Sequence, residues 1–220
     1  MAPEALIFDL DGVLVDSEEV WAKVREEFVR EHGGRWHENA QREMMGMSSK
    51  EWSRYMADEL GVSLSPQEIS DQVVERVCEV YRRDLPLIPG AVDAVRRLGA
   101  VWRLGLASSA NRPLINFVLE LAGLEPLFAV TISSEEVPRG KPAPDVYLEA
   151  LARLGVEPSR AAAVEDSGSG MRAARAAGLG VIAIPNRAFP PDRDALAAAD
   201  AVLESLDELT PDVVEAVLTR

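Results

Sequence analysis

Two aspartates separated by one residue follow a short apolar run near the start of the chain. The run Ala5–Phe8 has the length and composition of a strand that is buried on both faces. Alternate residues of a strand share a face, so Asp9 and Asp11 would crowd together if the strand continued. Gly12 permits a turn there, which leaves Asp9 at the tip of the strand and Asp11 in the turn. The stretch therefore indicates either a cation site or an ordinary Asp-Gly turn.

Three further segments place polar side chains at the ends of predicted strands or in the loops that follow them. They are a strand over 102–108 that ends at Ser108 and Ser109, a strand over 129–133 that Lys141 follows, and a strand over 161–165 that ends at Glu165 and Asp166. In an open parallel sheet, ligands bind outside the carboxyl ends of the strands. Carboxylates, hydroxyls and one ammonium group would thus meet at the same edge, which predicts a functional site.

The composition excludes several classes of function. The 220 residues are 47% hydrophobic, which is enough for one large domain or for a core with an insertion. Acidic residues outnumber basic ones by 37 to 23, and the formal net charge of −14 disfavours nucleic-acid and anionic-membrane partners. No apolar run approaches the roughly 18–20 residues of a membrane span, and no signal-peptide pattern is present. The single cysteine, Cys78, favours a cytoplasmic location.

The periodicity of apolar residues divides the chain into two kinds of segment. Residues 16–86 show only helical spacing, and Ser65 followed by Pro66 marks the start of one helix. After Pro86, the predicted strands named above, with two more over 180–184 and 201–203, alternate with helices over 92–98, 113–122, 144–154 and 171–177. Such alternation is typical of a parallel sheet with crossover helices.

The first strand cannot bury itself alone, so it must join this sheet. We therefore expect an α/β fold with a Rossmann-like, doubly wound parallel sheet as its core, formed by residues 1–15 and 87–220. Residues 16–86 would form an all-helical cap domain inserted after the first strand.

The polar segments together resemble the four motifs of the haloacid dehalogenase-like hydrolases, in the branch that carries a helical cap after the first motif. The matching residues are Asp9-Leu10-Asp11-Gly12-Val13, Ser108, Lys141 within Gly-Lys-Pro-Ala-Pro-Asp, and Glu165-Asp166-Ser167 followed by Gly168 and Gly170. Their order is that of the family, and the resemblance spans nearly the whole chain. It implies Mg²⁺-dependent phosphoryl transfer through an aspartyl-phosphate.

The resemblance also implies which residues hold the ion. Asp9, the backbone carbonyl of Asp11 and Asp166 would be its protein ligands, and Glu165 would orient a water from outside the ligand set. Asp9 would be the nucleophile. Asp11 would protonate the leaving oxygen and afterwards take a proton from water.

The remaining residues would bind the phosphate. Lys141 would neutralise Asp9 and the transferring group, whereas Ser108 and the N–H groups of Ser109 and Ala110 would hold phosphate oxygens.

Three reactions are compatible with these motifs, and hydrolysis is favoured. Dehalogenases need no carboxylic acid at the second Asp position, so Asp11 argues for phosphate substrates. Phosphosugar mutases of this branch would be expected to have a cap histidine where this chain has Trp21. They would also have an arginine after the cap's Gly-x-Ser, where Ser49 stands here. A mutase remains the alternative within the family.

A non-enzymatic phospho-accepting signalling module is the alternative from another class, because receiver domains pair a similar acidic pocket with a lysine. The helical insertion and Asp11 argue against it. We expect a small phosphorylated metabolite as substrate, chosen by the cap, in which Arg42, Lys50 or Arg54 could bind a second anionic group. The protein is expected to be a monomer or a small homo-oligomer.

Overall fold

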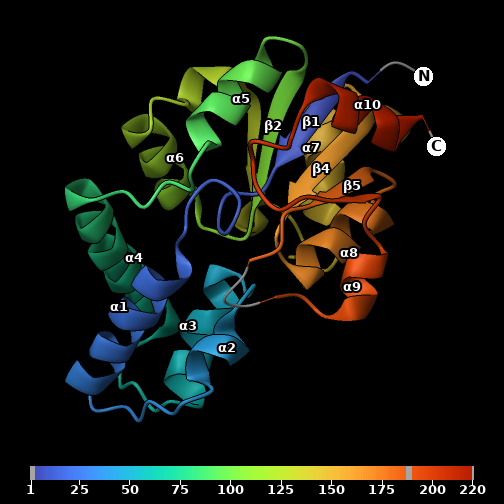
Figure 1. The fold of residues 1–220 in the computed structure, drawn as a ribbon. Helices are drawn as coiled ribbons and strands as arrows, with labels where there is room; N and C mark the ends of the chain where they lie inside the picture. The colour runs from blue at the N-terminus through green and yellow to red at the C-terminus, as the bar shows by residue number, and fades with distance from the viewer. Residues whose placement is uncertain (1–2, 187–189, 220) are drawn as a thin grey trace.

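A six-stranded parallel sheet forms the centre of the computed structural model, which describes residues 3–186 and 190–219. Its strands are β1 (Ala5–Phe8), β2 (Arg103–Ser108), β3 (Phe128–Ser133), β4 (Ala161–Glu165), β5 (Gly180–Ala183) and β6 (Ala201–Val202). The spatial order is β3-β2-β1-β4-β5-β6, and Figure 1 labels four of these strands, β2, β1, β4 and β5. The strand order reverses between β1 and β4, and a crevice for ligands is expected beyond their carboxyl ends.

The predicted strands are all present, and their bounds differ from the predictions by one residue at most at either end. The register places Leu6 beside Leu104 and Ala162, and Phe8 beside Leu106 and Val164. All of these residues are buried, as expected for strands covered on both faces.

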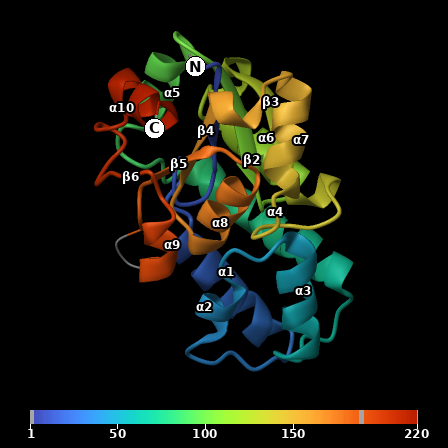
Figure 2. The same ribbon diagram turned by 90° about the vertical axis from the view of Figure 1, so that its right-hand side faces the viewer.

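Helices cover both faces of the sheet (Figure 2). One face carries α5 (Ala91–Gly99), α6 (Arg112–Leu121) and α10 (Pro211–Leu218), and the other carries α7 (Asp145–Leu154), α8 (Gly168–Ala176) and α9 (Arg193–Ala197). Alternate residues of β1 serve the two cores: Leu6 and Phe8 pack on the first set, Ala5 and Ile7 on the second. The doubly wound architecture predicted from the sequence is thus confirmed, although α9 and α10 were not predicted.

Short 3₁₀ turns occur at Glu125–Leu127, Ser134–Glu136 and Pro158–Arg160.

Between β1 and α5 the chain forms four helices. They are α1 (Glu18–Glu31), α2 (Ala40–Met44), α3 (Ser49–Asp58) and α4 (Pro66–Arg83), and Figures 1 and 2 show them grouped beside the sheet. The hydroxyl of Ser65 accepts a hydrogen bond from the Glu68 N–H, so α4 begins as the sequence predicts. Of the helices formed by the described residues, none combines the length and the apolar character needed to cross a membrane.

Two connections join this helical group to the sheet, and they lie side by side. Val15 and Leu87 form an isolated antiparallel bridge. The Asp16 N–H donates to the Pro86 carbonyl at 2.8 Å, and the Ile88 N–H donates to the Leu14 carbonyl at 3.0 Å. The chain therefore leaves the sheet for the helical group and returns to the sheet at one place.

Candidate active site

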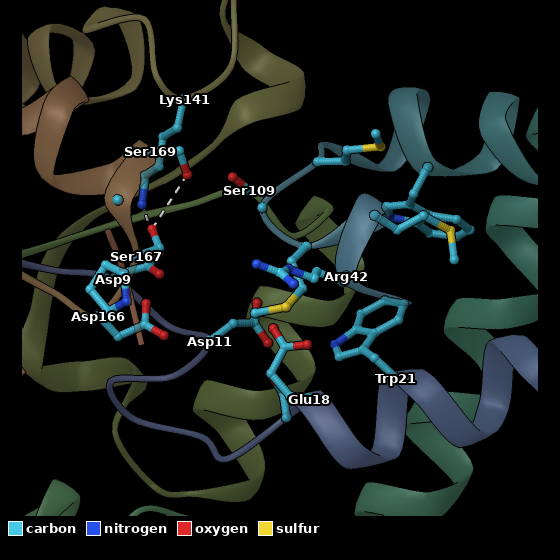
Figure 3. A pocket seen from close by; sticks show the side chains of 18 of the residues that line it. Asp9, Asp11, Glu18, Trp21, Arg42, Ser109, Lys141, Asp166, Ser167 and Ser169 are labelled. Carbon is cyan, nitrogen blue, oxygen red and sulfur yellow. Dashed lines mark hydrogen bonds and ion pairs between the residues drawn. The ribbon is translucent and has the colours of Figure 1, made fainter. Parts of the chain in front are cut away.

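A cavity of about 670 Å³ lies between the carboxyl-end edge of the sheet and the helical group. Figure 3 shows Asp9, Lys141 and Asp166 on one side of it and Trp21 and Arg42 on the other, with Asp11 and Glu18 between them. Residues from β1, from the loops after β2, β3 and β4, and from the helical group therefore meet at this cavity.

Lys141 joins two of the buried carboxylates. Its Nζ donates to Oδ1 of Asp9 at 2.8 Å and to Oε1 of Glu165 at 2.6 Å. A third hydrogen bond, to the carbonyl of Ala107, measures 2.9 Å and uses the remaining proton of the ammonium. Burial alone would lower the pKa of Lys141, but the two carboxylates hold it above its ordinary value. The side chain is therefore a fixed positive charge beside Asp9.

Glu165 is wholly buried and is fully engaged by protein donors. Besides Lys141, its Oε1 accepts the phenol O–H of Tyr147 at 2.6 Å, and its Oε2 accepts the hydroxyl of Ser167 at 3.1 Å. A methyl group on Gly170 would lie 1.9 Å from Oε1, so only glycine leaves room for this carboxylate. These contacts suit a residue that orients its neighbours. The sequence analysis missed Tyr147, because it lies on the apolar face of α7.

Asp166 is packed against the turn that follows β1. Gly12 has a φ of 78°, and a methyl group there would lie 1.9 Å from Oδ2 of Asp166. The Gly12 N–H donates to the Val15 carbonyl at 2.8 Å, which closes the turn. Gly12, which the sequence predicts to make this turn, is therefore needed for a second reason, because the carboxylate of Asp166 leaves no room for a side chain.

The carboxylates of Asp9, Glu165 and Asp166 can each offer one oxygen within 4.8 Å of the others. Burial raises the pKa of Asp9 to about 7, Lys141 opposes the rise, and Glu165 adds to it. Burial, Glu165 and Asp9 likewise raise the pKa of Asp166 well above its ordinary value. One lysine thus faces more negative charge than it can neutralise. A hard divalent cation with oxygen ligands would fit this donor set.

Asp11 lies in the turn and lines the cavity. Burial raises the pKa of its carboxyl group, and hydrogen bonding by Ser17 and Trp21, together with the nearby cations of Arg25 and Lys141, lowers it in part. A carboxyl group with a raised pKa that faces a cavity is suited both to donate a proton and to take one back.

The end of β2 is organised by Ser108, which has no exposed surface. Its Oγ accepts the Ala110 N–H at 3.0 Å, and the Ser133 hydroxyl donates to the Ala110 carbonyl at 2.7 Å. Ser109 and Ala110 line the cavity, whereas Ser108 lies behind them. The hydroxyl of Ser108 shapes the loop, and its direct contact with a phosphate remains a prediction.

Tryptophans form much of the cavity wall on the helical side. The rings of Trp21 and Trp52 pack edge to face, with centroids 5.7 Å apart, and both side chains are buried. Both also line the cavity. Among the three cations suggested as anion binders, Arg42 lines the cavity, whereas Lys50 and Arg54 are exposed elsewhere.

Comparison with known proteins agrees with this geometry. Residues 3–178 match the family model of haloacid dehalogenase-like hydrolases. The chain is 33% identical to hexitol phosphatase B of Escherichia coli, with 94% of each chain covered. It is 32% identical to validoxylamine A 7'-phosphate phosphatase of Streptomyces hygroscopicus, with 92% of this chain and 94% of that protein covered. A mutant of CbbY from Rhodobacter sphaeroides in complex with xylulose-1,5-bisphosphate is 30% identical and superposes with a TM-score of 0.85, covering 97% and 99% of the two chains.

Proposed function

Because this chain belongs to the haloacid dehalogenase-like hydrolases and is a phosphoric monoester hydrolase, we propose that it hydrolyses a small phosphorylated metabolite through a phosphorylated Asp9. The observation that carries this proposal is the contact between Lys141 and Asp9 at the floor of the cavity. The ammonium reduces the charge repulsion that a carboxylate nucleophile meets when it approaches a dianionic phosphate.

The first half-reaction uses both aspartates of the turn. An oxygen of Asp9 forms a bond to phosphorus while the ester oxygen leaves and receives the proton of Asp11. In the second half-reaction, Asp11 takes a proton from water, whose oxygen bonds to phosphorus and releases Asp9 and inorganic phosphate. A positioned acid–base of this kind contributes roughly 10²–10⁴-fold to the rate.

The phosphate would be held at the loop after β2. Ser109 and Ala110 line the cavity, and Oγ of Ser108, which accepts the Ala110 N–H, would donate its own O–H to a phosphate oxygen. We assign Ser108, Ser109, Ala110 and Lys141 to phosphate binding on this basis.

Mg²⁺ is the cofactor that the carboxylates would hold. Asp9, the backbone carbonyl of Asp11 and Asp166 would be its ligands, and Glu165 would support the site from behind. When bound, the ion supplies positive charge that stabilises the phosphoryl group in transfer.

We propose that residues 16–86 act as a cap domain over the core formed by residues 1–15 and 87–220. Its helices supply the wall opposite Lys141, so they would exclude water and select the substrate. The two adjacent connections at Val15 and Leu87 would allow the cap to move as a unit. Cys78 continues to favour a cytoplasmic location.

The experiment that tests the function is the Mg²⁺-dependent release of inorganic phosphate. Turnover of p-nitrophenyl phosphate and of a panel of phosphosugars is expected, and chelation of the metal should stop both. A phosphosugar mutase would instead yield an isomer with little net phosphate. A signalling module would be phosphorylated once and would not turn over.

A further inference from the structure

Arg25 is a buried cation on the cap wall of the cavity. It extends from α1 with 5% of its surface exposed, and it lines the cavity. Its guanidinium carbon lies 4.5 Å from the ring centroid of Trp21 and 4.9 Å from that of Trp52. The two rings therefore fix the plane of the guanidinium without using its N–H donors.

The donors of Arg25 are largely unused. Nε is buried and has no hydrogen-bond partner, and Nη1 makes a long contact of 3.4 Å with Oε1 of Gln41. Within the described part of the chain, no carboxylate lies within ion-pair distance of the guanidinium. Buried arginines are normally paired, because an unpaired buried charge is strongly destabilising. The free donors therefore indicate a partner that is absent from the polypeptide.

Gln41 separates Arg25 from the nearest acidic group of the cap. Its Nε2 donates to Oε2 of Glu18 at 2.8 Å, while its Oε1 faces Arg25. The amide thereby keeps the two charges apart and leaves the arginine available. Burial lowers the pKa of Arg25 to about 10, and the nearby carboxylates of Glu18 and Asp11 oppose this shift, so the guanidinium is still positively charged at neutral pH.

A second unpaired cation shares the wall. Arg42 of α2 lines the cavity and, among the described residues, makes no hydrogen bond or ion pair (Figure 3). In a chain with a net charge of −14, two unpaired guanidinium groups at one cavity are a specific feature.

We propose that Arg25 and Arg42 bind a second oxyanion of the substrate, a carboxylate or a phosphate, at the end remote from the phosphoryl group that Asp9 attacks. Arginine matches both groups, because its planar donors pair with two oxygens at once. The preferred substrates would be phosphorylated sugar acids or sugar bisphosphates rather than phosphorylated neutral polyols. This inference rests on the proposed function, since it names the substrate class of the same site.

The test compares three ligands that share a six-carbon chain: glucitol 6-phosphate, 6-phosphogluconate and glucitol 1,6-bisphosphate. Each is measured as a competitor of p-nitrophenyl phosphate hydrolysis, which gives an inhibition constant whether or not the ligand is turned over. We expect the two ligands with a second oxyanion to bind roughly 10- to 100-fold more tightly than the neutral one. The inhibition constants of 6-phosphogluconate and glucitol 1,6-bisphosphate show whether a carboxylate or a phosphate is preferred as the second oxyanion.

Arg25→Met should remove this preference, because methionine preserves the packing between the tryptophans but not the donors. Lys23→Met is the matched control, since Lys23 is an exposed cation on the same helix, and it should leave the preference unchanged. Circular dichroism reports whether Arg25→Met folds. If this variant does not fold, the test passes to Arg42→Gln, a substitution at an exposed position, which must reduce the preference for ligands with a second oxyanion. Equal binding of the three ligands by the natural protein would overturn the inference, as would a preference that survives in the folded variant. Failure to hydrolyse p-nitrophenyl phosphate would instead refute the proposed function.

Discussion

The Nζ of Lys141 lies 2.8 Å from Oδ1 of Asp9, although the two residues are 132 positions apart in the chain. Adjacent parallel strands bring Asp9 and Glu165 to one edge, and the loop after β3 carries the lysine between them. This single ammonium is fully hydrogen-bonded by other partners, and no cation of the described residues forms an ion pair with Asp166. The arrangement is therefore prepared to receive both a divalent ion and a phosphoryl group.

Asp9→Asn should reduce phosphate release by at least about 10³-fold, because an amide is a poor nucleophile and weakens the attraction to Lys141. The fold should be retained, since the substitution preserves shape. The measurement is phosphate release at saturating Mg²⁺, with circular dichroism on the same sample. Asp93→Asn, at an exposed position on α5, is the control and should be fully active. An active Asp9→Asn protein would contradict the assignment of the nucleophile.

Asp11→Asn should slow hydrolysis by roughly 10²–10⁴-fold, and the loss should depend on the leaving group. An alkyl phosphate needs a proton on the departing oxygen, whereas p-nitrophenolate leaves without one. With p-nitrophenyl phosphate we therefore expect a rapid burst of nitrophenolate followed by slow turnover, because only the water step still needs Asp11. Stopped-flow absorbance measures both phases. Equal losses for alkyl and nitrophenyl esters, with no burst, would argue against Asp11 as the acid–base.

The strands and the motif residues could be predicted from the sequence because both depend on local features. A strand buried on both faces is a short apolar run, and the carboxyl ends of parallel strands meet whatever the loops between them do. Asp9, Lys141 and Asp166 could therefore be assigned to one site before any distance was known. The short helices α2 and α9, of five residues each, are too short to show a period.

The cavity wall formed by α1 and the other helices between β1 and α5 could not be predicted, because helical periodicity does not state how a helix is oriented over a neighbouring sheet. One signal was present in the sequence. Trp21, Arg25 and Phe28 lie on one stripe of α1, and a cation on an otherwise apolar stripe marks a buried charge. Tyr147 gave no such signal, since a tyrosine on an apolar face is most often core.

The raised pKa values of Asp9 and Asp166 should make stability depend on pH in a defined direction, and bound Mg²⁺ should weaken that dependence. The folded protein holds protons on Asp9 and Asp166 more tightly than the unfolded chain does, because their pKa values are raised. Without metal, the free energy of unfolding should fall as the pH rises from about 4, the ordinary carboxyl range, towards about 7, the pKa of Asp9. Mg²⁺ should oppose this loss, so it should raise the melting temperature more at pH 8 than at pH 5. Equal shifts at both pH values would contradict the metal assignment.

Tyr147→Phe should lower kcat with little change in KM, because the phenol touches Glu165 rather than the substrate. Loss of a hydrogen bond to a buried carboxylate is worth roughly 1–3 kcal/mol, or about 5- to 150-fold in rate if it is expressed fully in the transition state. Tyr55→Phe removes a comparable phenol, bonded to Glu43 on the cap surface, and should leave kcat unchanged. If Tyr147 serves only to fill the core, Tyr147→Phe will also leave kcat unchanged.

Gly12→Ala separates backbone strain from the close approach of Asp166. A non-glycine residue at positive φ loses about 1–2 kcal/mol of stability, and this applies equally to Gly155→Ala, where φ is 64° and no atom lies within 4 Å of the added methyl group. At Gly12 the methyl group would also meet Oδ2 of Asp166 at 1.9 Å and force that carboxylate away. We therefore expect both variants to melt at lower temperature, whereas Gly12→Ala alone should lose phosphatase activity and the stabilisation by Mg²⁺. The measurements are melting curves with and without Mg²⁺ and phosphate release. Similar activities for the two variants would show that Asp166 can move without loss of activity. The close packing of Asp166 against Gly12 would then not be required for catalysis.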